Sequence, residues 1–139
     1  LDGMSVAVGG QTFILPLGSI VESLQITDHE LKTVSGDGRL LHVRGEYLPL
    51  VALHEVFSIT KAISEPKQGI AVIIEAEGKK TALLVDELLG QHQVVIKSLE
   101  SNFRKVPGIS GATIMGDGKV ALILDVMALS EQHAAGINM

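Results

Sequence analysis

The sequence contains no cysteine, and this absence excludes several kinds of site at once. No disulfide framework can form, no thiolate can bind zinc, and no cysteine nucleophile is available. The chain also lacks tryptophan, and only 3% of its residues are aromatic. Because hydrophobic residues still make up 46% of the sequence, we expect a core built mainly from aliphatic side chains. A chain of this length can bury such a core without covalent cross-links.

Positive charge is in short supply. The chain has 11 lysine and arginine residues against 16 aspartate and glutamate residues, which gives a formal net charge of −5. Lys79–Lys80 and Arg104–Lys105 are only pairs, not clusters. Since a protein that binds phosphate backbones usually carries a basic excess, we expect no nucleic-acid partner.

Long hydrophobic runs are absent too. No run reaches the roughly 20 residues that span a bilayer, and the first residues lack the basic start of a signal peptide. We therefore expect no direct membrane insertion. Because the sequence begins with leucine and not with methionine, we also expect the chain to be part of a larger protein.

Short apolar runs alternate with glycine-centred turns, and this pattern predicts an all-β fold with short helices. The expected strands are Met4–Val8, Gln11–Leu15, Ile20–Gln25, Leu31–Val34, Leu40–Val43, Tyr47–Leu50, Ile70–Ala76, Lys80–Val85, Val94–Lys97, Ala112–Met115 and Lys119–Asp125. The expected helices are Val51–Phe57 and Val126–His133.

Two segments of the sequence have echoes further along the chain. Gln11–Leu15 resembles Lys79–Leu83, and Gly45–Val51 resembles Gly118–Leu124. Two copies of about five strands fit two small barrels packed side by side. The polar stretch Ser58–Gln68 is the best boundary, so we expect subdomains at about 12–66 and 67–125. The N-terminal strand and the C-terminal helix complete the barrels, which should share an apolar interface.

A search for reactive or metal-binding groups finds none that is convincing. The five histidines do not have the spacing of metal ligands on one helix, and no nucleophile elbow or phosphate-binding loop occurs. The turns Gly36-Asp37-Gly38 and Gly116-Asp117-Gly118 are expected to be ordinary hairpin turns. The neighbouring carboxylates Asp86 and Glu87 should point to different faces of an extended chain. We therefore expect no catalytic residue, no metal site and no cofactor.

Two segments are candidates for contact with a partner. After Gly90, the polar residues Gln91-His92-Gln93 lead into Val94-Val95-Ile96. This polar step into a strand suits a docking edge, but a glycine bulge at a barrel corner explains it equally well. Arg44-Gly45 is a similar case: the arginine is either a contact for carboxylates or a solvated turn residue.

The motifs that carry a family resemblance are Gly90–Leu99, Phe103–Ile114, the Arg-Gly-x-x-x-Pro segment within Val43–Leu50, and Leu84–Asp86. On these residues the chain, from Leu1 to about Leu129, resembles the CheW-like domain family. The resemblance is to the C-terminal regulatory domains of bacterial chemotaxis histidine kinases of the CheA type. It implies a CheW-like fold, with two intertwined five-stranded SH3-like barrels. The opening Leu1–Met4 resembles the junction that follows the ATP-binding domain of such kinases.

The resemblance also implies a function in two-component signalling. The domain would bind the CheW adaptor, the cytoplasmic tip of a methyl-accepting chemoreceptor and other domains of the parent kinase. It would couple receptor signals to kinase autophosphorylation, in the cytoplasm, at receptor arrays on the inner face of the membrane. By position in the family, the partner-binding residues would lie near the groove between the barrels: Val21, Glu22, Leu24, Arg44, Gly45, Leu88, Gly90, Gln91, His92 and Val94.

Two alternatives stay open at this point. The closer one is a free-standing CheW-type adaptor, which the missing methionine and the kinase-like junction disfavour. The more distant one is a small β-barrel hydrolase or ligand carrier. That alternative predicts a deep pocket with convergent polar groups.

Overall fold

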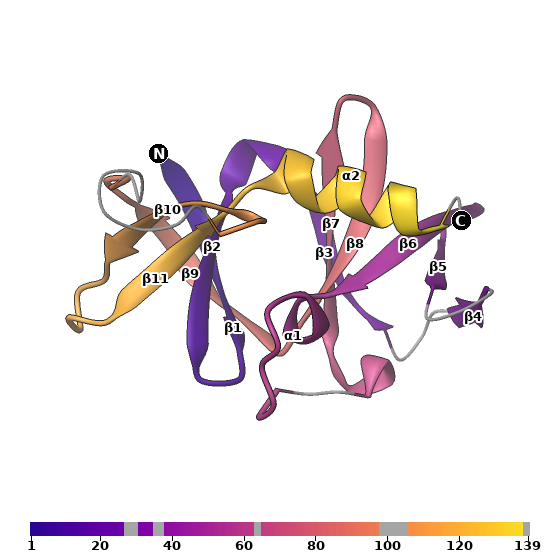
Figure 1. The fold of residues 1–139 in the computed structure, drawn as a ribbon, viewed down its shortest axis with the longest axis horizontal. Helices are drawn as coiled ribbons and strands as arrows, with labels where there is room; N and C mark the ends of the chain where they lie inside the picture. Colours follow the sequence, from indigo (N-terminus) through magenta and orange to yellow (C-terminus); the bar gives the residue numbers. More distant parts are fainter. Residues whose placement is uncertain (27–30, 35–37, 63–64, 98–105, 138–139) are drawn as a thin grey trace.

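The computed structural model describes residues 1–26, 31–34, 38–62, 65–97 and 106–137, and its strands form two sheets (Figure 1). The five-stranded sheet has the order β10-β11-β2-β1-β9, and the six-stranded sheet has the order β3-β7-β8-β6-β5-β4. The first sheet consists of β1 (Asp2–Val8), β2 (Gln11–Pro16), β9 (Glu87–Gln93), β10 (Ile109–Ile114) and β11 (Val120–Leu124). The second consists of β3 (Ile20–Gln25), β4 (Leu31–Thr33), β5 (Arg39–Val43), β6 (Glu46–Ala52), β7 (Ile70–Ala76) and β8 (Lys79–Val85).

Each sheet curls toward a barrel, and the chain that leaves one edge strand leads directly to the opposite edge of the same sheet. In the five-stranded sheet, the chain continues beyond β9 to Lys97, which forms a bridge with Ala112 in β10 at the opposite edge. In the six-stranded sheet, β3 ends at Gln25 and β4 begins at Leu31 on the opposite edge. These are the two small barrels that the sequence predicts, here called barrel one (five strands) and barrel two (six strands).

The two barrels exchange strands. The hairpin β1–β2 belongs to barrel one, but the next strand, β3, pairs with β7 of barrel two. The hairpin β7–β8 belongs to barrel two, but the next strand, β9, pairs with β1 of barrel one. The barrels are therefore intertwined, and each takes strands from both halves of the chain. The subdomain limits at about 12–66 and 67–125 stay a prediction.

The internal echo corresponds to equivalent strand pairing. The sequence comparison aligned Ile14 with Ala82 and Leu50 with Ile123. In the structure, Ile14 lies opposite Ile123 in a parallel pair, and Ala82 lies opposite Leu50 in a parallel pair. The duplicated segments thus meet in the same register in both barrels, which confirms the echo at the level of single residues.

One hydrophobic core joins the two barrels. It contains Val6 and Phe13 from barrel one, Val72 and Leu83 from barrel two, and Leu129 from the C-terminal helix. Two connecting elements complete it: the short helix α1 (Leu53–Val56) and the helix α2 (Val126–Ile137). The helix α2 leaves barrel one and runs along barrel two, where it contacts β6, β7 and β8 (Figure 1). The predicted apolar interface between the barrels is therefore confirmed.

The remaining elements are short. Two 3₁₀ helices, η1 (Leu17–Ser19) and η3 (Pro66–Gln68), precede β3 and β7. The predicted helix Val51–Phe57 is shorter than expected, because Val51 and Ala52 extend β6 beside β8. The described residues do not include several positions that entered the sequence analysis: His29, Gly36–Asp37, Ser98–Leu99 and the residues 103–105.

One strand prediction was wrong. The sequence pattern placed a break at Gly90 and a strand at Val94–Lys97, but β9 runs through Gly90 from Glu87 to Gln93. The physical reason is a bulge, because the register against β1 shifts between Ser5, which faces Gly90, and Val6, which faces Leu88. The bulge takes up Leu89 as the extra residue, so Gly90 remains paired with Ser5 and the strand does not end there. Of the predicted strand, only Lys97 forms a bridge.

Candidate partner-docking surface

The ten predicted contact residues fall into two groups, one in each barrel. Val21, Glu22 and Leu24 lie on β3, and Arg44 and Gly45 form the turn between β5 and β6 of barrel two. The other group belongs to barrel one: Leu88, Gly90, Gln91 and His92 on β9, and Val94 just after it. The two strands hold equivalent places, since β3 pairs beside β7 as β9 pairs beside β1.

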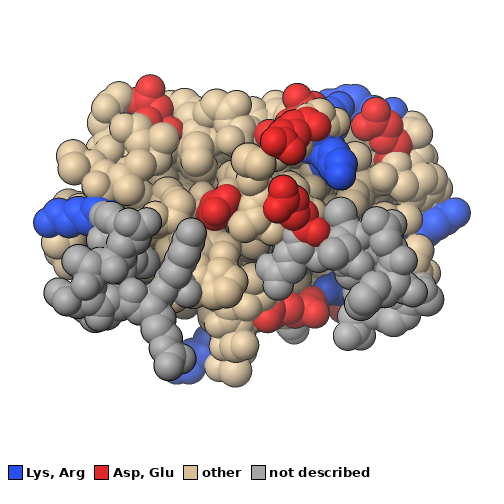
Figure 2. Space-filling model, turned by 45° about the horizontal axis from the view of Figure 1, so that its top comes forward, with Lys and Arg blue, Asp and Glu red and all other residues tan. Residues whose placement is uncertain are grey.

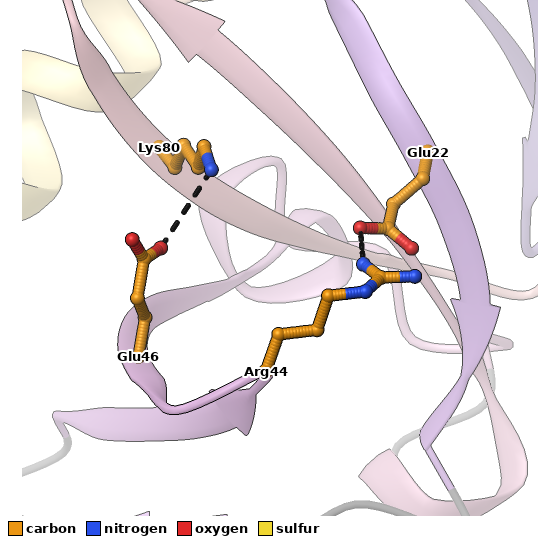
Figure 3. Close-up of polar contacts among 4 residues, drawn as sticks. All are labelled: Glu22, Arg44, Glu46 and Lys80. Atoms are coloured by element: carbon orange, nitrogen blue, oxygen red, sulfur yellow. Dashed lines mark hydrogen bonds and ion pairs between the residues drawn. The ribbon is translucent and has the colours of Figure 1, made fainter.

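In barrel two, the structure brings β3 and the β5–β6 turn together. Arg44 and Gly45 both have positive φ, 48° and 81°, as the two central residues of a tight hairpin turn require. The Arg44 guanidinium donates to the Glu22 carboxylate, and the ion pair between Lys80 and Glu46 lies nearby (Figure 3). Because the Arg44 side chain is 72% exposed, the ion pair contributes little stability. Arg44 is thus a turn residue whose charged end remains accessible to a partner.

In barrel one, the polar side chains of β9 are partly engaged with β1. His92 Nε2 lies 3.0 Å from Ser5 Oγ, and Ser5 Oγ donates to the carbonyl of Gly90 at 3.1 Å. The Gln93 amide donates to the Asp2 carboxylate. The Val94 side chain is buried in a small cluster of barrel one. The polar side chains of this segment therefore stabilise the pairing of β1 with β9.

An apolar surface lies at the end of barrel one, and of its residues sequence reasoning had named only Val95 and Ile96 as candidate contacts. Four exposed side chains gather at the end of barrel one, and we call them the barrel-one patch: Val95 (77% exposed), Ile96 (49%), Ile114 (59%) and Val120 (53%). Ile114 and Val120 lie opposite each other across β10 and β11, and Val95 and Ile114 line one open groove of about 270 Å³. The alternation of buried Thr113 with exposed Ile114 beside the Gly116–Gly118 turn was the available signal.

The equivalent positions on barrel two carry different chemistry. His42 lies opposite Tyr47, as Ile114 lies opposite Val120, and their rings stack with centroids 4.5 Å apart. The Lys32 ammonium lies 5.0 Å from the centre of the Tyr47 ring, within the range of a cation–π contact. Hence the end of barrel two is aromatic and cationic, whereas the end of barrel one is aliphatic.

On the face that Figure 2 shows, charged side chains of both signs are scattered among the described residues and form no continuous patch of either sign. Within the part of the chain that the structure describes, no three His, Asp or Glu residues come together as a metal site would require. The helices described there are all too short or too polar to cross a membrane. Asp86 accepts a hydrogen bond from the Gly9 amide at 2.8 Å and so holds the β1–β2 turn.

These features define a class of protein: an intertwined double barrel with exposed strand edges and an apolar end. The chain belongs to the CheW-like domain family, whose model matches residues 2–134. The solved structure of the scaffolding protein TtCheW from Thermoanaerobacter tengcongensis has the same fold, with a TM-score of 0.74. That match covers 89% of this chain and 88% of that chain at 17% sequence identity.

Within the family, the similarity to one kind of protein is particularly high. The chain is 61% identical to the chemotaxis protein CheA of Salmonella typhimurium, over 93% of this chain and 19% of that protein. It is 47% identical to CheA of Rhizobium meliloti (93% of this chain, 17% of that protein). It is 37% identical to the sensor histidine kinase CheAY of Helicobacter pylori (94% of this chain, 16% of that protein). The chain thus spans at most about a fifth of these relatives' length.

Proposed function

We propose that this chain is the regulatory docking domain of a chemotaxis histidine kinase. It binds a CheW-type adaptor and the cytoplasmic tip of a chemoreceptor, and it couples receptor signals to autophosphorylation by the parent kinase. The proposal places the domain in the cytoplasm, at receptor arrays. Support comes from the high identity to one part of CheA proteins. The single observation that carries the docking role is the barrel-one patch.

The physical argument rests on exposed apolar area. Burial of such area contributes about 25 cal/mol per Å², and contiguous apolar surface is where monomeric proteins meet partners. Three side chains of the barrel-one patch lie together, since Ile114 is opposite Val120 and lines one groove with Val95, so one partner surface can cover these three. An interface of modest area built on them gives nanomolar to micromolar affinity.

The adaptor and the receptor would use different surfaces. We assign the adaptor to the barrel-one patch, because its aliphatic side chains suit a dry interface. We assign the receptor to the residues predicted from the family other than Val94, whose side chain is buried. Among them, Arg44 offers an exposed guanidinium for carboxylates. The other domains of the parent kinase remain further expected partners.

The chain itself is proposed to be non-catalytic. The Ser5–His92 contact resembles a nucleophile beside a base, but Ser5 is only 1% exposed and its hydroxyl donates to the Gly90 carbonyl. A nucleophilic serine needs access to substrate and a hydroxyl proton directed at the base. This geometry disfavours a hydrolase, and the purified chain should neither bind ATP nor become phosphorylated by it.

A free-standing CheW-type adaptor is the closest alternative. The fold is shared with TtCheW, but the sequence identity to that scaffold is 17%, against 61% to Salmonella CheA. The kinase domain is therefore favoured.

Isothermal calorimetry with a CheW-type adaptor from the same organism tests the proposal. Two matched substitutions make it specific: Val120→Asp on the barrel-one patch and Val21→Asp on β3, at valines that are 53% and 48% exposed. Val120→Asp should weaken adaptor binding by at least about tenfold, as a buried carboxylate in an interface does. Val21→Asp should change adaptor binding by less than about twofold, which is typical of residues outside an interface.

Two results would count against the proposal: no heat from the wild-type chain, or equal losses from the two variants. Circular dichroism spectra of both variants must match that of the wild type, so that misfolding is excluded. Against receptor tips, the order should reverse, with Val21→Asp the more damaging change.

A further inference from the structure

Each barrel is closed by pairing between a segment that follows one edge strand and the strand at the opposite edge. This pairing is less extensive in barrel one than in barrel two, and the internal repeat allows the two to be compared residue by residue. In barrel two, β4 pairs with β5 at consecutive positions: Leu31–Leu41, Lys32–Leu40 and Thr33–Arg39. The internal repeat aligns Pro49 with Leu122. Leu40 lies opposite Pro49 and Ala112 lies opposite Leu122, so Leu40 and Ala112 hold equivalent positions. The pair Lys32–Leu40 in barrel two therefore corresponds to the pair Lys97–Ala112 in barrel one. That pair is an isolated bridge. Beyond it the walls separate, and the groove of about 270 Å³ opens.

The β10 wall of this groove carries an open backbone edge. Ala112 exchanges two hydrogen bonds with Lys97, with N···O distances of 2.8 and 3.0 Å. Residues two apart in a strand direct their backbone groups to the same side, so the N–H and C=O of Ile114 face the groove. The next residue, Met115, faces the other way, and its N–H donates to the carbonyl of Lys119 at 2.8 Å. Among the described residues, nothing occupies the groove-side N–H and C=O of Ile114.

The side chains of the groove define what could fill it. Val95, Ile114 and Met115 give the lining its apolar part, and His92, Gln93 and Thr113 give it polar groups. Lys97 adds a positive charge at the end where the bridge lies. Among the described residues, no aspartate or glutamate lines the groove, and Lys97 forms none of the ion pairs found there. Lys97 is thus a positive charge on the groove in a chain of net charge −5, and the described carboxylate next to the lining is that of Asp2, which accepts a hydrogen bond from Gln93.

We propose that the groove binds an extended segment of a partner protein, which adds a strand to the free edge of β10. An unpaired strand edge is a template for such addition, and main-chain hydrogen bonds supply much of the affinity. The segment places an apolar side chain between Val95 and Ile114 and a carboxylate near Lys97. The inference rests on the proposed function in taking the segment from a protein partner.

A blocked synthetic peptide that alternates valine with glutamate is the probe, and amide spectra of the ¹⁵N-labelled chain are the readout. We expect saturable shifts at the amides of Val95, Lys97 and Ile114. The same peptide with an N-methyl group on its central valine should bind about tenfold more weakly, because it cannot donate the strand hydrogen bond. Lys97→Gln should weaken binding several-fold and remove most of its salt dependence.

Ile114→Pro tests the site from the side of the domain. Proline lacks the N–H that faces the groove, yet no hydrogen bond to β11 depends on that N–H. This variant should lose peptide binding while the matched control Ile114→Val retains it. If Ile114→Pro fails to fold, the N-methylated peptide still decides the question.

Three results would overturn the inference: shifts that map elsewhere, no saturable binding, or equal binding of the N-methylated peptide. If the adaptor binds in calorimetry but the peptide leaves the groove unshifted, the inference fails and the proposed function stands. If the peptide binds at the groove but the adaptor does not bind, the adaptor assignment fails instead.

Discussion

Phe13 and Phe57 stack with their ring centroids 5.1 Å apart and their planes inclined by 25°. Phe13 lies on β2 of barrel one, whereas Phe57 follows α1, at the point where the chain leaves barrel two. Gly108 completes the contact, since a Cβ atom at that position would lie 3.2 Å from the Phe57 ring. The end of one barrel is thus anchored in the core of the other, and the two should fold and unfold as a unit.

Replacing Phe57 by alanine should therefore destabilise both barrels together. We expect the free energy of unfolding to fall by about 2–4 kcal/mol, because the stacked ring and its apolar contacts are lost. Phe57→Leu, which retains most of the apolar volume, should cost only about 1 kcal/mol. Urea denaturation followed by circular dichroism should show one cooperative transition for each variant. Two separate transitions would mean that the barrels are independent units.

The closure of barrel one can be tested at Gly111. A Cβ atom there would lie 2.8 Å from Ile96 Cγ2 and 2.9 Å from the carbonyl oxygen of Lys97. Gly111→Ala should push this segment away from β10 and cost about 1–3 kcal/mol. Gly116→Ala is the matched control, since a Cβ atom at Gly116 would meet nothing within 4 Å. Hydrogen exchange of the Lys97 amide should accelerate only in Gly111→Ala. Equal behaviour of the two variants would contradict the description of this bridge.

The contact between the C-terminal helix and barrel two depends on a buried hydroxyl pair. Thr81 Oγ1 on β8 lies 3.3 Å from Ser130 Oγ on α2, and both residues are buried. Ser130→Ala should cost about 1–2 kcal/mol, because it leaves the Thr81 hydroxyl without this partner. Adding Thr81→Val should recover part of the loss, since neither hydroxyl then remains buried. Thermal unfolding of the single and double variants measures this, and strictly additive losses would show that the hydroxyls do not interact.

Much of the fold could be predicted from the sequence, because turn chemistry fixes hairpins locally. Glycines at positive φ mark the β1–β2, β5–β6 and β7–β8 turns, and the apolar runs between them give the strands. The echo between Gln11–Leu15 and Lys79–Leu83 predicted two similar barrels, and the structure shows equivalent parallel pairs at these segments. The family resemblance drawn from the motifs was confirmed by the match over residues 2–134.

The exchange of strands was beyond local reasoning, because it depends on partners far along the chain. A glycine bulge near Gly90, by contrast, was one of the two interpretations that the sequence offered, and the shift in register against β1 confirms it. β9 passes through Gly90 only because β1 lies beside it, at a sequence separation of 85 residues for the Ser5–Gly90 contact. The residues that could contact a partner were harder to predict than the strands. Val94 and Val95 are adjacent and chemically identical, yet Val94 is 8% exposed and Val95 is 77% exposed. Only the pairing of the segment with β1 and β10 decides which of them meets solvent.

The central claim is that this domain meets its adaptor at the end of barrel one. The most direct measurement is a map of amide shifts in the ¹⁵N-labelled chain upon addition of a CheW-type adaptor. We predict that the affected amides cluster on the barrel-one patch, at Val95, Ile96, Ile114 and Val120. Shifts confined to α2 or to the end of barrel two, or an unchanged spectrum at saturating adaptor, would contradict the claim.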